Sequence, residues 1–449
     1  MDMIAAVKNA GVVGAGGAGF PSHVKLNTRA EWFLVNAAEC EPMIEIDKYL
    51  CRTQPERIIR TMMEIAGHLH AEHAVIALKG KYRKEITALQ TAIDKLLAPV
   101  SIFPMRTFYP AGDEQVIVRQ VTGKCVPERG LPLDVGCVVH NVGTVLSIAD
   151  ALEEKPVIDK DLSVTGAVAK PVIFRVPIGT PIPDILAAAG VKKNGCGLVL
   201  GGPMMGKFLK SEDEIENSFV TKTTGNLLVL PREHDLFHKA AQSVERMKRQ
   251  AQAACIQCRM CTDLCPRFLM GHNVTPHLVM RNVWREESIT DMDEYLSCFG
   301  SAANCCNCGA CELFSCPMDL SPRRMNDFVK GQMQKKGIQV EKNQNPQARA
   351  AEEIHKIPTE RLIARLGLST YVTHEEPDNY ELIPKSCYIL LSQHIGKPAV
   401  PVVEIGSMVS RGALVAKAAE GLSVNMHTGI EGVVTEITSQ GIRICGKEE

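Results

Sequence analysis

Two cysteine-rich runs decide how the middle of this chain folds: CIQCRMCTDLCP at residues 255–266 and CCNCGACELFSCP at residues 305–317. Each run contains three cysteines spaced two residues apart and ends on a Cys-Pro pair, and the second has one extra residue before its last cysteine. Of the 17 cysteines, ten lie between Cys255 and Cys316. Such a dense patch in a long chain indicates metal binding rather than a disulfide scaffold.

The spacing within the two runs predicts two [4Fe–4S] clusters. Three thiolates at two-residue spacing can bind three corners of a four-iron cluster, and the cysteine before proline then reaches the other cluster. We therefore expect a first cysteine group and a second cysteine group, one for each cluster. The first is Cys255, Cys258, Cys261 and Cys316, and the second is Cys305, Cys308, Cys311 and Cys265.

Two alternatives to this ligand assignment stay open. Pairs of cysteines two residues apart also bind zinc, although eight cysteines in this order are better explained by two clusters. Within the second run, Cys306 could replace Cys305, but its gap to Cys308 would be a single residue.

The bulk composition excludes several classes of protein. The 449 residues are 45% apolar and 22% charged, as in ordinary globular domains. The net charge of −1 gives no general attraction to nucleic acid or to anionic membranes. No apolar run approaches the ~20 residues of a membrane span, and the first residues lack the basic and apolar segments of a secretory signal. We expect a cytoplasmic protein with no membrane span and no nucleic-acid partner.

The sequence pattern divides the chain into five segments. Buried strands at WFLVNAA (32–38) and AVIALKG (74–80) alternate with amphipathic helices, which predicts an α/β domain with a largely parallel sheet. The last segment has short strands broken by glycine, which predicts a small all-β module. The expected boundaries are 1–157 for the α/β domain, 158–235 for a small α+β module, 236–335 for a helical cluster domain, 336–378 for a linker and 379–449 for the all-β module.

A glycine-rich run, GAGGAGFP at residues 14–21, opens the first domain. Glycines let main-chain N–H groups approach a phosphate or a flat ring, and Lys25 could add a positive charge. The run is neither a GxGxxG fingerprint nor a Walker loop. A flexible turn is the alternative, but clusters pass single electrons, and a flavin is the usual converter from hydride.

Four sequence motifs favour a flavin-binding site. They are GGAGFPSHVK (16–25), NAAECEP (36–42), YPAGDEQ (109–115) and HNVGT (140–144), here called the first to fourth motifs. In this order they resemble the flavin- and NADH-binding subunit of respiratory complex I and the RnfC component of the Rnf electron-transport complex. Residues 164–186 resemble the soluble-ligand-binding β-grasp (SLBB) module of both, and the two ferredoxin runs match the Rnf branch.

The order of the segments points to a narrower family. Residues 391–416, LSQHIGKPAVPVVEIGSMVSRGALVA, resemble the barrel-sandwich hybrid that RnfC proteins have at their N-terminus. Here this module follows the clusters, an order similar to that of the cobalamin reductases of propanediol-utilisation microcompartments. Residues 425–429, NMHTG, stand where a swinging-arm lysine would be. We therefore expect a docking or structural module.

The resemblance implies a cofactor site, and no catalytic residue is identified. The implied cofactor-binding residues are Gly16, Gly17, Gly19, Lys25, Asn36, Glu39, Glu41, Tyr109, Gly112, Asp113, Glu114, Asn141 and Thr144. The glycines would lie against the flavin and nicotinamide, and Lys25 would contact the flavin phosphate or NADH. Glu41 would bind the nicotinamide ribose or amide, and the fourth motif would hold the ribityl phosphate. Taken singly, acids such as Glu39 and Glu41 are more often surface residues.

The resulting hypothesis is an NADH-dependent reductase with FMN and two [4Fe–4S] clusters. By resemblance its acceptor is cob(III)alamin and then cob(II)alamin, which would reactivate a B12-dependent diol dehydratase. The resemblance also implies a microcompartment lumen, with an adenosyltransferase and a shell protein as partners. The alternatives are the electron-input subunit of an Rnf-type complex, which couples NADH and ferredoxin, and an electron-relay adaptor without flavin.

Overall fold

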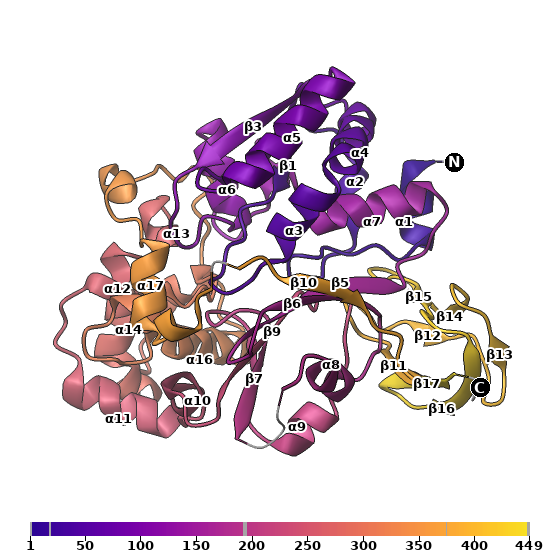
Figure 1. Cartoon of the computed structure of the whole chain (residues 1–449). Helices are drawn as coiled ribbons and strands as arrows, with labels where there is room; N and C mark the ends of the chain where they lie inside the picture. The colour runs from indigo at the N-terminus through magenta and orange to yellow at the C-terminus, as the bar shows by residue number, and fades with distance from the viewer. Residues whose placement is uncertain (1, 18, 192–194, 374, 447–449) are drawn as a thin grey trace.

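Figure 1 shows the computed structural model of the chain, which describes residues 2–17, 19–191, 195–373 and 375–446. The first domain is built on a parallel four-stranded sheet in the order β3-β2-β1-β4. The strands are β1 (Trp32–Asn36), β2 (His73–Lys79), β3 (Val100–Met105) and β4 (Cys137–Asn141). The predicted strands WFLVNAA and AVIALKG correspond to β1 and β2, and the predicted α/β class is confirmed.

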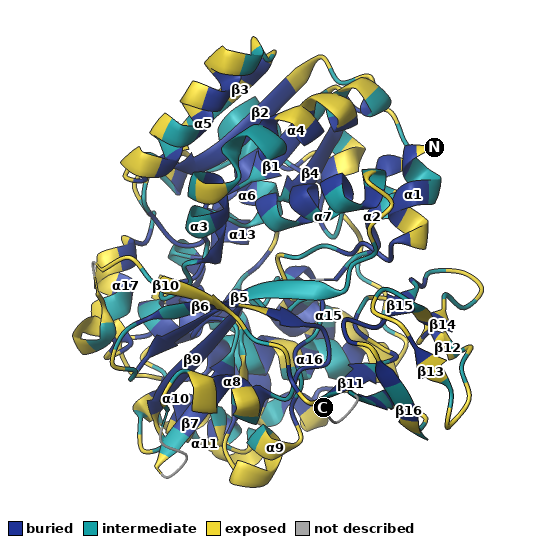
Figure 2. Ribbon diagram, turned by 45° about the vertical axis from the view of Figure 1, so that its right-hand side comes forward, coloured by how far each residue is buried: buried dark blue, intermediate teal, exposed yellow. Residues whose placement is uncertain are grey.

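Helices cover both faces of this sheet, because successive residues of a strand point to opposite sides. Phe33 and Val35 of β1 pack with the helices of one face, whereas Leu34 packs on the other. Figure 2 shows the buried strands between these exposed helices. The first face holds α1 (Met3–Asn9), α2 (Ser22–Leu26), α3 (Ile46–Thr53), α4 (Pro55–Leu69), α5 (Arg83–Leu96) and α7 (Val142–Leu152), and the second holds α6 (Glu114–Thr122).

The order in which the chain adds strands to this sheet reverses between β1 and β4, although all four strands run parallel. From β1 the chain passes to β2 and then β3, and it returns through α6 and the short helix η1 (Pro132–Val135) to β4, on the other side of β1. Asn36 and Asn141 end these two strands and lie opposite each other in register. In open α/β sheets, ligands bind beyond the carboxyl ends of the strands at such a reversal.

The second module is a six-stranded mixed sheet below the first domain in Figure 1, in the order β10-β6-β5-β9-β7-β8. Its edge strand β10 comes from far along the chain and pairs in parallel with β6. Its elements are β5 (Asp159–Gly166), β6 (Val172–Pro177), α8 (Ile182–Ala188), β7 (Cys196–Leu200), β8 (Lys207–Leu209), α9 (Glu212–Glu216), β9 (Asn226–Pro231) and β10 (Asp378–Glu381).

Short helices surround the two cysteine runs. They include α10 (Asp235–Ala240), α11 (Val244–Ala254), α12 (Met260–Asp263), α13 (Pro266–Leu269), α14 (Pro276–Asn282), η2 (Val283–Ser288), α15 (Met292–Phe299), η3 (Gly300–Asn304), η4 (Cys311–Ser315) and α16 (Pro322–Lys335). The segment that follows contains η5 (Ala350–Glu353), α17 (Thr359–Arg365) and η6 (Ser369–Tyr371) and leads to β10. In Figure 1, α17 lies beside the cluster helices.

The last module is a small barrel of two sheets around its own apolar core. One sheet holds β11 (Ser386–Leu390), β17 (Gly441–Cys445), β16 (Gly432–Ile437) and β13 (Met408–Val409), and the other holds β12 (Val400–Pro401), β14 (Leu414–Lys417) and β15 (Met426–His427). Met426 and His427 are buried, and Asn425 accepts a hydrogen bond on its carbonyl from Lys222 at 2.8 Å. These residues therefore pack against the rest of the chain instead of forming a free tip.

Candidate functional site

The carboxyl edge of the first sheet brings the four motifs together. Asn36, at the end of β1, donates a hydrogen bond from Nδ2 to the Gly112 carbonyl at 2.9 Å, and this joins the second and third motifs. Its Oδ1 accepts from the Ala38 amide at 3.0 Å and shapes the loop after β1. The side chain therefore holds two loops at the point where the strand order reverses.

The glycine-rich loop lies against the fourth motif. The Ala15 amide donates to Oγ1 of Thr144 at 2.8 Å, and a Cβ added at Gly16 would lie 3.5 Å from Cβ of Asn141. Gly17 has φ +113°, and a Cβ there would meet no described atom within 4 Å. One side of the loop is thus fixed to the start of α7, while no described atom closes the space beside Gly17, so main-chain groups there stay open to approach.

Lys25 supplies the positive charge of this region. Its Nζ lies 2.6 Å from Oε1 of Glu114 and donates to the Val139 carbonyl at 3.2 Å. The neighbouring His140 is buried, and burial, followed by the charge of Lys25, lowers its pKa to about 3. His140 is therefore neutral at ordinary pH.

Some buried polar atoms of α2, α6 and β4 have no hydrogen-bond partner among the described residues. They are Oγ of Ser22, Nδ1 of His23, Oε1 of Gln115 and Nε2 of His140. Unpaired buried polar atoms are costly, and a bound ligand is one way to satisfy them. His140 is the one of these residues whose pKa the Lys25 charge lowers, so its unpaired Nε2, the lysine and the glycine loop together suit a polar, anionic cofactor such as FMN.

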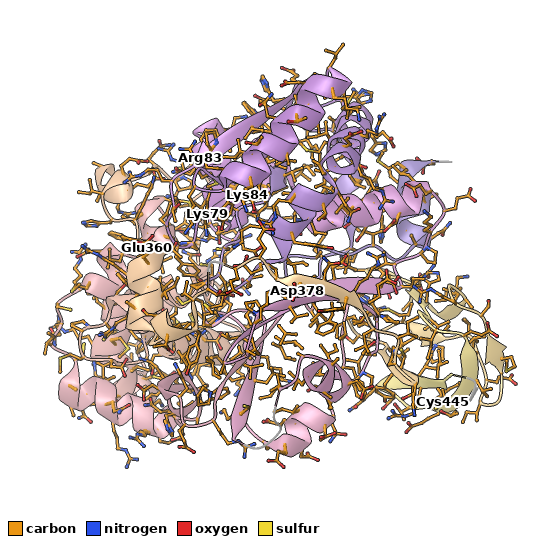
Figure 3. All side chains as sticks on the ribbon, in the orientation of Figure 1. Lys79, Arg83, Lys84, Glu360, Asp378 and Cys445 are labelled. Carbon is orange, nitrogen blue, oxygen red and sulfur yellow. The ribbon has the colours of Figure 1, made fainter. Side chains whose placement is uncertain are left out.

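The predicted acid Glu39 is buried beside a second acid that the sequence analysis missed. Its Oε2 accepts from the Asp47 amide at 2.8 Å, and Asp47 accepts from Nδ2 of Asn141 at 2.9 Å. Lys79, labelled in Figure 3, donates to the Glu39 carbonyl at 2.7 Å. Burial, followed by the Asp47 charge, raises the pKa of Glu39 well above its usual value. Glu39 is thus not a surface acid.

Glu41 joins the first domain to the second sheet. Its Oε2 accepts from the amides of Met204 at 2.7 Å and Met205 at 3.3 Å, in the turn between β7 and β8. A Cβ on Gly202 would lie 2.1 Å from the same oxygen, so the turn approaches closely only because this residue is glycine. Burial raises the pKa of Glu41 to about 7. The contact to a nicotinamide ribose remains a prediction.

The third motif faces two ways. Glu114 meets Lys25, and Gly112 packs so closely on Cys40 that an added Cβ would lie 2.7 Å from Cβ of Cys40. On the other side, Tyr109 is fully buried and donates its hydroxyl to the Cys308 carbonyl. The motif therefore contacts both the lysine region and the second cysteine run.

Asp113 forms an ion pair that the sequence analysis missed. It caps α6 by accepting from the amides of Gln115 and Val116 at 3.0 and 3.2 Å. Both of its oxygens also accept from Arg267, at 2.7 and 2.8 Å. Arg267 lies two residues after Cys265 and is 8% exposed. Its place after a Cys-Pro pair was the only available signal.

The first cysteine group is centred on Cys261. Burial and the nearby thiols of Cys316, Cys255 and Cys258 raise the pKa of Cys261 to about 12. Cys316 thus joins three cysteines of the first run although it belongs to the second. Cys258 is the exposed member of the group.

The second cysteine group is more deeply placed. Cys265, Cys308 and Cys311 are buried. Burial and the thiols of Cys305 and Cys265 raise the pKa of Cys311 well above its usual value. Among the described residues, no three histidine, cysteine or acidic side chains lie close enough to hold one metal ion. The cysteines of a [4Fe–4S] cluster lie farther apart than the ligands of one metal ion, because each thiolate binds a different iron atom.

The backbone of the two runs repeats, which bears on the choice between Cys305 and Cys306. Cys255 has φ −71° and ψ 108°, and Cys305 has φ −67° and ψ 128°. The positive φ angles that follow repeat in the pairs Gln257 and Asn307 (55° and 57°) and Arg259 and Gly309 (69° and 79°). The repeat aligns Cys305 with Cys255. Cys306 lies close by and forms a hydrogen bond with Cys308. This bond is the largest of the causes that lower the pKa of Cys306 to about 6.

The extra residue of the second run is taken up by a π-helical turn. The first run has the α-helical turn α12 before Cys265, whereas the second has the π-helical turn η4 before Cys316. A π-helical turn closes over one more residue than an α-helical turn. The backbone then returns to the same conformation, with φ −72° and ψ 121° at Cys265 and φ −75° and ψ 113° at Cys316.

Family models match the chain in the same order as its modules. They are the Nuo51 FMN-binding domain at 7–150, the SLBB domain at 162–208, the 4Fe-4S dicluster domain at 254–321 and the RnfC barrel sandwich hybrid domain at 370–447. The predicted multidomain fold is therefore confirmed. An FMN-binding domain joined to an iron–sulfur domain defines an electron-transferring oxidoreductase.

Comparison with whole proteins narrows this class. The chain is 42% identical to the cobalamin reductase PduS of Citrobacter freundii over 442 residues, which cover 98% of the chain and 95% of that protein. The chain belongs to the PduS cobalamin reductase family. It is also 32% identical over 275 residues to the C component of the proton-translocating ferredoxin:NAD(+) oxidoreductase complex of Clostridium ljungdahlii, covering 60% of the chain and 56% of that protein.

A solved structure shares the fold. It is an NAD+-reducing [NiFe]-hydrogenase in the H2-reduced state, with a TM-score of 0.50 and 20% identity, covering 74% of this chain and 62% of that one. At this identity the likeness concerns the fold alone. Within the described residues, no helix combines the length and apolar character needed to cross a membrane.

Proposed function

We propose that the chain oxidises NADH at an FMN bound to the carboxyl edge of the first sheet and passes the electrons through two [4Fe–4S] clusters to a cobalamin. The observation that supports this most is the meeting of all four motifs at the reversal between β1 and β4. The third motif also contacts the second cysteine run through Tyr109, and it contacts Arg267, just after the first run, through Asp113.

The protein's own residues have distinct tasks in this proposal. The glycine loop and Lys25 bind the anionic cofactor, and Asn141 and Thr144 position the loop. Neutral His140 can donate or accept a hydrogen bond there without adding charge. When bound, FMN supplies the conversion between a hydride and single electrons. The two cysteine groups hold one cluster each, with Cys305 rather than Cys306 as ligand.

The acceptor is proposed from the family. The name of the relatives, cobalamin reductase, supports cob(III)alamin and cob(II)alamin as acceptors. With that acceptor, the chain would reactivate a B12-dependent diol dehydratase in a bacterial microcompartment lumen. An adenosyltransferase and a shell protein would then be its neighbours.

Anaerobic reconstitution tests the proposal. We expect one FMN and about eight irons per chain, NADH-driven bleaching of cluster absorbance, and reduction of cob(III)alamin. Lys25→Ala should lower FMN content, whereas Lys95→Ala, which removes a lysine of an exposed ion pair, should not. Protein that takes up clusters but no flavin would reject the reductase in favour of an electron-relay adaptor.

A second candidate is the electron-input subunit of an Rnf-type complex. The match of residues 370–447 to the RnfC barrel favours it. It predicts stable co-purification with membrane partners and NADH-dependent reduction of ferredoxin. Reduction of cobalamin by the isolated chain, without such partners, would favour the first proposal.

A further inference from the structure

Three separate contacts join the first domain to the second cysteine group. The Tyr109 hydroxyl donates to the Cys308 carbonyl, and the bidentate Asp113–Arg267 pair lies two residues beyond Cys265. The third contact runs through the Met204 main chain. Its amide donates to Glu41, and its carbonyl would lie 3.1 Å from a Cβ on Gly309, between Cys308 and Cys311.

The apolar packing follows the same division. Cys306 and Cys308 share an apolar cluster with Tyr109, Cys40 and Met43 of the first domain. In the first cysteine group, Cys255 and Cys316 pack instead in an apolar cluster formed by α11, α14, α15 and α16. The second group therefore faces the flavin-binding domain, and the first group faces the exposed side, where Cys258 lies.

A buried charge accompanies this division. Arg267 acts electrostatically on Cys306 and Cys308, and Asp113 holds its guanidinium with both oxygens. The first cysteine group also has an arginine in its run, Arg259 between Cys258 and Cys261, but both side chains of its 3.2 Å ion pair with Asp263 are exposed. Charges near a cluster set its reduction potential, and solvent screens exposed charges more than buried ones.

We propose that the cluster held by the second cysteine group is the first to receive electrons, and that Arg267, fixed by Asp113, is a positioning residue that raises its reduction potential. This rests on the proposed function. One hydride from NADH supplies two electrons and one proton, and NADH becomes NAD+. Each cluster accepts one electron, passing from the 2+ to the 1+ state, and the proton is released to solvent. Electrons then leave through the first cysteine group, at Cys258.

A redox titration followed by electron paramagnetic resonance tests the positioning role, using the reconstituted full chain and dithionite. Arg267→Gln removes a buried positive charge, and we expect the potential of one cluster to fall. Asp113→Asn removes a negative charge and leaves the arginine, so the reduction potential of the same cluster should rise. Arg259→Gln is the matched control. It should lower the reduction potential of the other cluster, and by less than Arg267→Gln lowers that of the cluster in the second group.

The outcomes separate the two proposals. Fewer than two [4Fe–4S] signals in the unmodified chain would reject the proposed function. If both signals are present, three results would overturn the role of Arg267. They are potential shifts of the same sign in Arg267→Gln and Asp113→Asn, potential shifts in both clusters, and no potential shift. Opposite shifts confined to one cluster would support it, since a merely structural defect does not change sign with the removed charge.

Rapid freezing after mixing with NADH tests the order of the clusters. In Cys258→Ala, which disturbs the exposed group, the remaining cluster should still be reduced as fast as in the unmodified chain. In Cys308→Ala, reduction of the remaining cluster should be at least tenfold slower, because its nearest donor is missing. The reverse pattern would overturn the proposed order. If either variant fails to bind its cluster, rapid freezing of the Arg267→Gln protein tests the order instead: its shifted signal marks the second group and should appear first.

Discussion

The two cysteine groups come from nearly the same sequence pattern and the same backbone repeat, yet they lie in different surroundings. The first packs within the helices of the cluster region and has the exposed Cys258, with Ile256 and Met260 also exposed. The second is enclosed by the third motif and the Met204 turn. A ligand motif thus fixes how a cluster is held, while its neighbours decide what it exchanges electrons with.

The largest expected effect is loss of one whole cluster. With an iron chelator under mild conditions, the first cysteine group should lose its iron before the second, because Cys258 is exposed whereas Cys265, Cys308 and Cys311 are buried. Iron content and the resonance signals of the reduced protein follow the loss with time. Simultaneous loss from both groups would show that the difference in burial does not protect the second cluster.

Removal of the Tyr109 side chain should have the next largest effect, a loss of stability. This side chain is 1% exposed, so Tyr109→Ala leaves a cavity and should cost about 3–5 kcal/mol of stability. Tyr109→Phe removes only the hydrogen bond to Cys308 and should cost about 1 kcal/mol. Urea unfolding followed by circular dichroism measures both. Equal costs for the two variants would contradict the packing role.

Glu41 should make the contact between domains sensitive to pH. Burial raises its pKa from 4.5 to about 7, so the folded chain binds more protons between these values than the unfolded chain. The stability from this group is therefore present below pH ~4.5 and is lost as the pH rises through ~7. Glu41→Gln should flatten this decline, and melting temperatures of both proteins between pH 5 and 8 would show it. An unchanged slope would assign the decline to other groups.

Gly202→Ala should cost less stability than Tyr109→Ala. The new Cβ would lie 2.1 Å from Oε2 of Glu41, and overpacking of this kind costs about 1–3 kcal/mol. Gly67→Ala is the matched control, since Gly67 lies inside α4 and an added Cβ meets no described atom within 4 Å. It should stabilise the chain by up to ~1 kcal/mol. Thermal unfolding compares the two.

Local patterns in the sequence predicted much of the fold. The runs around Phe33 and Ile76 read as strands because a parallel strand covered on both faces is nearly continuously apolar. The cysteine runs were readable because their spacing is set within a dozen residues. The order of the motifs along the chain also predicted the modules that the family models match.

Contacts between distant segments were not predictable in the same way. The Asp113–Arg267 pair joins residues 154 apart, and the contact of Glu41 with Met204 joins residues 163 apart. An isolated arginine after a Cys-Pro pair, or an acid in a loop, resembles many surface residues. The pairing of β10 with β6 also depends on the path of the chain through the cluster region. Only the assembled structure shows which of these side chains are buried together.

Lys222 suggests how one arrangement can be encoded in two domain orders. Its Nζ donates to the carbonyls of Gly11 at 2.6 Å and Asn425 at 2.8 Å, and Asn425 in turn donates to the Asn9 carbonyl at 3.2 Å. The barrel that follows the clusters in sequence therefore touches the segment just after α1. A gene rearrangement that moved the barrel ahead of that helix could keep this packing, because the barrel already contacts the start of the first domain. Moving the whole barrel module to a new place in the gene is then a small evolutionary step.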